Sequence, residues 1–166
     1  MSTINLPYFG YLDSDALEKY YDADVDFNNT QIQVDLNFDN KGIEADRLEI
    51  VGRFINNIRI HDINNRKYID NDFTDEKGET VREYAEQHIE ELNPGDLAEL
   101  LGANIKTEDK PEQLVKKLQL VRVGLYPDSL DQFATFDYSI GTELTNYLVV
   151  IFTDENGNLD YMTLES

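Results

Sequence analysis

Alternating apolar and polar residues near the start of the chain predict a β-hairpin. In residues 21–27 and 32–38 every second position is apolar. These positions are Tyr21, Ala23, Val25 and Phe27 in the first segment, and Ile32, Val34, Leu36 and Phe38 in the second. Strict alternation is typical of a strand with one buried and one solvated face. The intervening Asn-Asn-Thr is typical of a turn, so we expect the strands to pair antiparallel.

The C-terminal part of the chain predicts four consecutive strands, in residues 118–126, 133–140, 147–153 and 159–164. Short segments rich in turn-forming residues separate them, which favours an antiparallel meander. The third strand begins with six consecutive apolar residues, Tyr-Leu-Val-Val-Ile-Phe. Because a strand without polar positions is covered on both faces, we expect it at the centre of the sheet. Residues 6–12 predict one short edge strand, since Pro7 is tolerated only at a sheet margin.

Between these regions the apolar residues follow a helical period. The first stripe consists of Leu48, Val51, Phe54, Ile55 and Ile58, and it either continues to Phe73 or breaks near residues 64–65. Thr80 and Glu83 have the spacing of a capping box, which predicts that a second helix starts at Thr80. Short helices are expected between Pro94 and Gly102 and after Pro111.

The segregation of strands from helices predicts an α+β fold. We expect an antiparallel sheet of about six strands, built from the N-terminal hairpin and the C-terminal four-strand meander, with three to four helices packed on one face. The 166 residues fit a single domain, residues 1–166. A chain of this length buries roughly 70% of its unfolded surface, which provides a core without disulfides. The sequence contains no cysteine.

The net charge of -20, from 34 acidic and 14 basic residues, is unevenly distributed. The predicted strand regions, residues 1–41 and 118–166, hold 16 acidic and 3 basic residues. Such a charge repels nucleic acid and anionic lipid and attracts a basic partner or a cation. We find neither a signal peptide nor an apolar run of about 18 residues, so we expect a cytoplasmic protein.

No motif of known catalytic or cofactor chemistry occurs in the chain, so we predict no enzyme activity, no cofactor and no metal site. Residues 154–160, Asp-Glu-Asn-Gly-Asn-Leu-Asp, resemble a calcium loop, but the glycine is at the fourth position rather than the sixth. A type I′ turn at residues 156–157 explains them better. Residues 70–76 are interpreted as a solvated acidic loop, and His61 and His88 as hydrogen-bonded core or interface residues.

The solvated face of the N-terminal hairpin is the candidate partner-binding site. Asp22, Asp24, Asp26 and Asp35 should lie there, with neighbouring members about 7 Å apart along a strand and about 5 Å apart across strands, which is unfavourable without a partner. They form either a docking face for a basic partner or a cation, or a charged edge that resists aggregation. In the meander the only base, Arg122, should face Asp137; it makes either a cross-strand ion pair or a contact with a ligand in a groove.

Four strings of residues resemble an uncharacterised bacterial family, domain of unknown function 2004. They are Tyr-Phe-Gly-Tyr-Leu-Asp (8–13), Val-Arg-Val-Gly-Leu-Tyr-Pro-Asp (121–128), Phe-Asp-Tyr-Ser-Ile-Gly (136–141) and Tyr-Leu-Val-Val-Ile (147–151). The resemblance spans nearly the whole chain and implies a bacterial, single-domain protein without membrane spans. It carries no catalytic residues over to this chain.

The composition and the candidate site together predict a non-enzymatic, acidic protein-binding domain. Its concrete form would be an immunity-type inhibitor of a basic toxin, by analogy of composition with such inhibitors. The alternative is a small-ligand or calcium-binding domain. A hydrolase with an unfamiliar carboxylate site is a third hypothesis.

Overall fold

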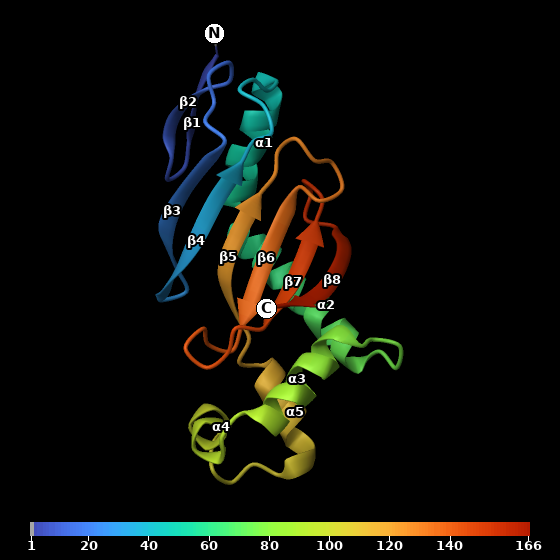
Figure 1. Ribbon diagram of the computed structural model, residues 1–166. Helices are drawn as coiled ribbons and strands as arrows, with labels where there is room; N and C mark the ends of the chain where they lie inside the picture. Colours follow the sequence, from blue (N-terminus) through green and yellow to red (C-terminus); the bar gives the residue numbers. More distant parts are fainter. Residues whose placement is uncertain (1) are drawn as a thin grey trace.

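The segments predicted as strands form two sheets, and all the helices lie between the fourth and the fifth strand in chain order (Figure 1). The computed structural model describes residues 2–166. A small sheet contains β1 (Thr3–Leu6) and β2 (Gly10–Asp13). The main sheet contains β3 (Tyr20–Phe27), β4 (Thr30–Asn37), β5 (Gln119–Leu125), β6 (Ala134–Ser139), β7 (Leu148–Thr153) and β8 (Leu159–Glu165). The helices within the described residues are α1 (Ala45–Asn56), α2 (Ile58–Thr74), α3 (Thr80–Glu91), α4 (Pro94–Leu101) and α5 (Lys110–Val115), with a 3₁₀ turn at Thr107–Asp109.

The predicted N-terminal hairpin is confirmed as β3 and β4, which pair antiparallel from Tyr20–Asn37 to Phe27–Thr30. Asn28 and Asn29 form the turn, with φ values of 48° and 67°. Two consecutive left-handed residues define the turn type whose twist matches that of the two strands. The apolar residues of β4 are buried, whereas the aspartates of β3 are exposed. One face of the hairpin is therefore packed, and the other is solvated along β3 as the alternation predicted, but not throughout β4, where Asp35 is buried.

The hairpin joins the meander in one six-stranded sheet of order β3-β4-β5-β6-β7-β8. Every neighbouring pair is antiparallel except β4 and β5, which run parallel, with Val34 opposite Val123. A parallel junction needs a long crossover connection, and here this connection contains all five helices. The predicted α+β class is confirmed, with a sheet that is mostly rather than wholly antiparallel.

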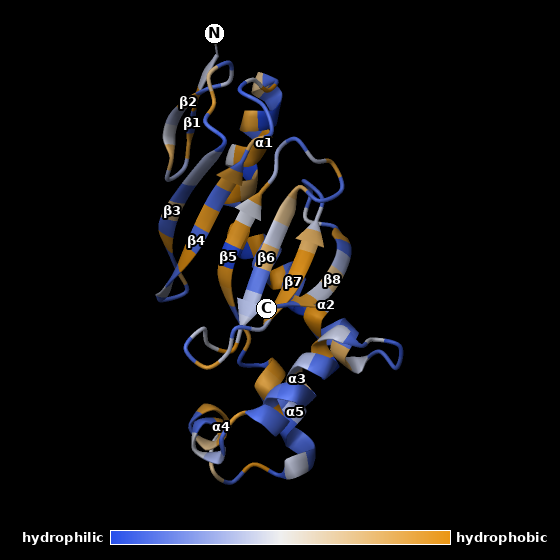
Figure 2. Ribbon diagram, viewed as in Figure 1, coloured by the Kyte–Doolittle hydropathy of each residue, from blue (hydrophilic) through white to orange (hydrophobic). Residues whose placement is uncertain are grey.

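The predicted central position of the strand in residues 147–153 is wrong, because β7 lies next to the edge strand β8. The most buried strand is β6, whose six residues are all buried although three of them are polar. Figure 2 shows β7 as apolar along most of its length. Val150 on its second face is fully buried, yet it lies outside the main hydrophobic core. The apolar sequence of β7 correctly predicted a strand that is buried on both faces, but it did not predict the position of this strand in the sheet.

Helices α1 and α2 pack behind the sheet, while α3, α4 and α5 extend below it in Figure 1. The ring of Phe54 on α1 lies 5.2 Å from that of Phe133 and 5.9 Å from that of Phe136 on β6. Helical structure continues through residues 64–65 to Phe73, which is one of the two predicted alternatives, but it is interrupted at Asn57. The Asn57 side chain donates to the carbonyl oxygen of Arg53, and the Asn57 backbone lies outside the helical region.

Residues 6–12 form most of a second hairpin, so the prediction of one short edge strand is wrong. The chain reverses direction between β1 and β2 through left-handed Tyr8 and Gly10, with φ values of 68° and 76°. Leu6 and Leu12 are buried, and Leu6 contacts α1 beside Gly52. The turn between the two four-residue strands is short and contains no polar segment, so the sequence pattern did not show that there are two strands.

Helix α3 starts at Thr80 as predicted, but Thr80 is not its capping residue. The amide of Val81 instead donates to Asp72 Oδ2 at 2.8 Å. Asp72 lies in the last turns of α2, so a tertiary contact replaces the local capping box. Of the acidic residues 70–76, interpreted as a solvated loop, residues 70–74 belong to α2, while Asp75 and Glu76 follow its end.

A buried hydrogen bond fixes α2 to the sheet. Tyr138 on β6 donates to Asp62 Oδ1 at 2.7 Å, and both residues are buried. Burial raises the pKa of Tyr138 well above its ordinary value, and the charge of Asp62 raises it further. The hydroxyl therefore remains a donor to Asp62, which also pairs with Arg66 on the next turn of α2.

We expect Tyr138→Phe to lower the free energy of unfolding by about 2 kcal/mol, because a buried carboxylate loses a hydrogen bond. Urea unfolding measures this change. Tyr161→Phe is the matched control: Tyr161 is 45% exposed on β8, and its loss should change stability by less than about 0.5 kcal/mol. Equal effects of the two variants would show that the Tyr138–Asp62 bond does not hold the helix to the sheet.

Candidate functional site

The face of the main sheet opposite α1 and α2 carries no helix among the described residues (Figure 1). We call it the open face. Two rows of paired residues cross it from β3 to β8. The first row is Asp24, Gln33, Arg122, Asp137, Val150 and Thr163, and the second is Asp22, Asp35, Gly124, Thr135, Phe152 and Tyr161. The open face therefore gathers acidic residues from both halves of the sequence around a single arginine.

Arg122 forms the centre of the open face. Its Nε donates to Asp35 Oδ2 at 2.7 Å and its Nη2 donates to Asp35 Oδ1 at 3.0 Å, which is a bidentate ion pair. Nη1 donates to Asp137 Oδ2 at 3.3 Å, and Nη2 also donates to the Tyr126 hydroxyl at 3.2 Å. Both interpretations of Arg122 thus receive support: it makes the predicted ion pair with Asp137, and it also lines a cavity.

Gly124 makes room for this ion pair. Arg122 lies opposite Gln33, whereas Asp35 lies opposite Gly124, so the arginine side chain must cross the glycine to reach the aspartate. A Cβ atom on Gly124 would lie 2.5 Å from Arg122 Nη2 and 2.9 Å from Cζ. A side chain at position 124 would therefore displace the Arg122 guanidinium from its present position against Asp35.

The predicted exposure of Asp35 is wrong, because its exposed fraction is 0%. The guanidinium of Arg122 covers it and satisfies both carboxylate oxygens, and Asn37 donates to Oδ1 at 2.7 Å. Asp137 is also buried, with 7% of its surface exposed. These two aspartates are thus internal partners of Arg122 and do not offer free carboxylates to a ligand.

The side chains of Asp22, Asp24 and Asp26 are exposed to solvent, as predicted. They are successive outward-facing residues of β3, an edge strand of the sheet. No basic side chain forms a salt bridge with any of them within residues 2–166. The hairpin therefore presents three uncompensated carboxylates in a line.

The charges around Arg122 do not balance. Burial by itself lowers the pKa of Arg122, but its hydrogen bonds to Asp35 and Tyr126 and the nearby negative charges raise the pKa above its ordinary value. Burial raises the pKa of Asp137; Arg122 opposes this change, whereas Glu165 and Asp35 add to it. A permanently charged guanidinium thus faces more negative charge than it can neutralise.

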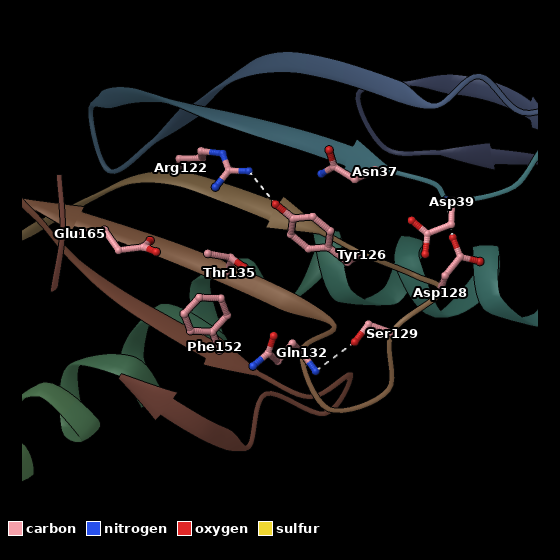
Figure 3. A pocket seen from close by; sticks show the side chains of 10 residues that line it. All are labelled: Asn37, Asp39, Arg122, Tyr126, Asp128, Ser129, Gln132, Thr135, Phe152 and Glu165. Carbon is pink, nitrogen blue, oxygen red and sulfur yellow. Dashed lines mark hydrogen bonds between the residues drawn. The ribbon is translucent and has the colours of Figure 1, made fainter. Parts of the chain in front are cut away.

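A cavity of about 390 Å³ opens beside Arg122 (Figure 3). Figure 3 shows the rings of Tyr126 and Phe152 on either side of Thr135, with the carboxyl groups of Asp39 and Asp128 close together at one end. The complete lining is Asn37, Asp39, Arg122, Tyr126, Asp128, Ser129, Gln132, Thr135, Phe152 and Glu165. Three of its four acidic and basic charges are thus negative, and its single base is already paired.

The sequence reasoning missed the residues of this cavity, apart from Arg122. Tyr126 could have been found, because Arg122, Gly124 and Tyr126 alternate along one strand and so share a face. Asp39 and Asp128 follow the ends of β4 and β5. Their proximity results from the parallel pairing of these two strands, which local patterns did not predict.

The two histidines, which the sequence offered as further candidates, are both buried. His88 Nδ1 lies 2.6 Å from the carbonyl oxygen of Tyr84 and Nε2 lies 2.8 Å from Thr145 Oγ1, as expected for a hydrogen-bonded core histidine. His61 stacks on Phe54 with ring centroids 4.0 Å apart, and burial lowers its pKa. The Nδ1 atom of His61 is buried and has no hydrogen-bond partner in the described part of the chain, so its predicted hydrogen bonding is not met at this atom.

The turn in residues 154–158 is confirmed, but it is not of type I′. Only Gly157 has a positive φ, of 83°, whereas a type I′ turn needs two such residues. The oxygens of Asp154 accept hydrogen bonds from the amides of Asn156 and Asn158 and from the Asn158 side chain. Among residues 2–166 the structure contains no group of three or more His, Asp or Glu side chains that could hold a metal ion.

Comparison of the chain with models of known families, with curated proteins and with solved structures finds no match. The resemblance to the uncharacterised bacterial family therefore stays a prediction. In the described part of the chain, none of the helices has the length and apolarity needed to cross a membrane.

We expect Asp35→Asn to lower the free energy of unfolding by about 3 kcal/mol, because Arg122 would lose its bidentate anion while remaining largely buried. Asp24→Asn removes the same charge from an exposed site and should change stability by less than about 0.5 kcal/mol. Urea unfolding of the two variants checks this difference. A similar small effect of both would mean that the ion pair does not stabilise the sheet.

The raised pKa of Asp137 predicts a pH-dependent stability difference between the wild type and Asp137→Asn. The folded state binds the Asp137 proton more tightly than the unfolded state does, so the stabilisation due to this proton is present at low pH. It is lost as the pH rises from about 4, the ordinary aspartate value, through the raised folded pKa. The unfolding free energy of the wild type minus that of Asp137→Asn should therefore fall as the pH rises above about 4. A difference that stays constant, or rises, would contradict the pKa shift.

Proposed function

We propose that this chain is a non-enzymatic binding domain whose open face holds a basic segment of a partner protein. The observation that carries the proposal is the unbalanced charge of that face. Arg122 is the only basic residue in the six strands, and Asp35 already neutralises it. Asp137, Glu165 and the three aspartates of β3 remain as an excess of negative charge.

The uncovered sheet provides the contact area for such a partner. Tyr20 and Tyr161 are 50% and 45% exposed at opposite edges of the open face. Phe152 stacks on Tyr161 with ring centroids 4.5 Å apart. Exposed aromatic rings supply rigid apolar contact surface, and partly exposed tyrosines retain a polar group for hydrogen bonding. The open face thus combines apolar contact with an attraction for positive charge.

The same charge distribution disfavours the other partner classes. Phosphate groups of nucleic acids and anionic lipids would meet a face whose only guanidinium is occupied. A basic protein segment would gain in association rate from the field of the whole chain, whose net charge is -20. An immunity-type inhibitor of a basic toxin is the concrete version of this proposal.

Reversal of the β3 charges tests the proposal against a control of equal net charge. The variant Asp22→Lys/Asp24→Lys/Asp26→Lys changes the net charge from -20 to -14, since each replacement adds two charges. The control Glu86→Lys/Glu90→Lys/Glu91→Lys makes the same change at exposed positions of α3. The probe is an unstructured peptide of alternating arginine and serine, titrated by calorimetry at several salt concentrations.

We expect the β3 variant to bind this peptide at least about tenfold more weakly than the wild type, which corresponds to about 1.4 kcal/mol for three reversed charges. The α3 control should stay within about twofold, and wild-type affinity should fall with rising salt. Equal losses in both variants would show that net charge alone governs binding, and the open face would then have no specific role. Absence of wild-type binding at low salt would refute the proposal.

A further inference from the structure

We infer that the cavity beside Arg122 receives one arginine side chain of the partner, with the guanidinium between Asp39 and Asp128. This inference rests on the proposed function and adds the position and the chemistry of its main anchor. The sheet face is not covered by a helix, and the cavity opens on it with a defined lining. Its volume of about 390 Å³ lies within the range of about 300–1,000 Å³ that is usual for ligand pockets.

The carboxyl pair at the end of the cavity supplies the charge complementarity. The amide of Asp39 donates to Asp128 Oδ2 at 2.8 Å, which holds the loop after β4 to the loop after β5. This bond fixes the Asp128 carboxylate while leaving its other oxygen free. The Asp39 carboxylate has no hydrogen-bond or salt-bridge partner among residues 2–166, and Figure 3 shows the two groups side by side. Two adjacent carboxylates without a cation are unfavourable, and a bound cation removes this cost.

The aromatic walls favour a planar cation with an aliphatic stem. Tyr126 and Phe152 line the cavity between the carboxyl pair and Glu165 (Figure 3). A guanidinium attached to a three-carbon chain can pack along these rings while its donors reach carboxylates. A lysine ammonium is a strongly hydrated point charge and would lose more hydration in the same place.

The protein already uses this mode of recognition on the same face. Arg122 lies flat across Gly124, bonds Asp35 through two nitrogens and reaches the hydroxyl of Tyr126. Tyr126 therefore has Arg122 on one side, and its ring is one wall of the cavity (Figure 3). Because Asp35 and Asp137 hold Arg122 in place, it does not compete for Asp39 or Asp128.

The two arms of the test use a small probe and matched variants. Nα-acetyl-arginine amide is titrated into the ¹⁵N-labelled protein at low salt, with Nα-acetyl-citrulline amide as an uncharged analogue of nearly the same shape. The cavity variant Asp39→Asn/Asp128→Asn and the control Glu86→Gln/Glu90→Gln on α3 each change the net charge from -20 to -18. All four of these acidic residues are exposed, so both variants should fold, which urea unfolding verifies.

We expect the arginine probe to shift the amide signals of Tyr126, Ser129 and Gln132 at millimolar concentration, and citrulline to leave them unchanged. The cavity variant should weaken this binding about tenfold, since it removes both carboxylates that would contact the guanidinium, and the control should stay within about twofold. Shifts confined to β3, or equal weakening by both variants, would overturn the inference.

The arginine–serine peptide separates failure of the inference from failure of the proposed function. If the peptide binds the wild type and the cavity variant equally but binds the β3 charge-reversal variant weakly, the open face binds basic segments without an arginine in the cavity. That result overturns the inference and keeps the proposed function. If the peptide does not bind the wild type, the proposed function fails, and the inference that rests on it fails too.

Discussion

The ion pair between Arg122 and Asp35 is the interaction on which the sheet depends. It bridges β4 and β5, the only parallel neighbours in the main sheet, and joins the N-terminal hairpin to the C-terminal meander. The two residues are 87 positions apart in the sequence. Because Asp35 is fully buried, removal of either partner would leave a charge in a poorly hydrated place. The contact thus specifies both the register of the junction and the charge at the middle of the open face.

The consequences of this ion pair extend to the rest of the face. Since the single guanidinium is paired with Asp35, the excess negative charge lies at Asp137 beside it and, farther out, at β3, at Glu165 and at the loops that follow β4 and β5. The parallel junction also brings those two loops together, so that Asp39 and Asp128 become neighbours. One nonlocal contact therefore organises the whole candidate site.

Local patterns predicted the parts of the fold that depend on neighbouring residues. The alternation in residues 21–38 predicted the hairpin, and the turn-rich segments after residue 118 predicted the meander and its order. Several of the predictions that were wrong required distant partners, whereas the single strand expected in residues 6–12 and the type I′ turn at residues 156–157 failed on local turn geometry. Asp35 looked exposed because nothing near it in the sequence indicated Arg122, and Thr80 looked like a cap because Asp72 is on another helix. The sheet-central position assigned to residues 147–153 failed for the same reason, since burial does not specify strand order.

The candidate site shows the same division between local and distant information. The outward aspartates of β3 and the direction of Arg122 follow from a period of two residues. The steric role of Gly124 does not follow from this period, because it arises only when Arg122 reaches across Gly124 toward Asp35.

Protection of a sheet edge against aggregation explains only part of the negative charge. It accounts for Asp22, Asp24 and Asp26, because charged side chains on an edge strand oppose pairing with another chain. It does not account for Asp39 and Asp128, which lie beyond the strand ends and line a cavity rather than an edge. Nor does it explain why the face carries aromatic rings beside those carboxylates, since exposed rings favour association. A surface that both attracts positive charge and offers apolar contact is better suited to binding a partner than to avoiding one.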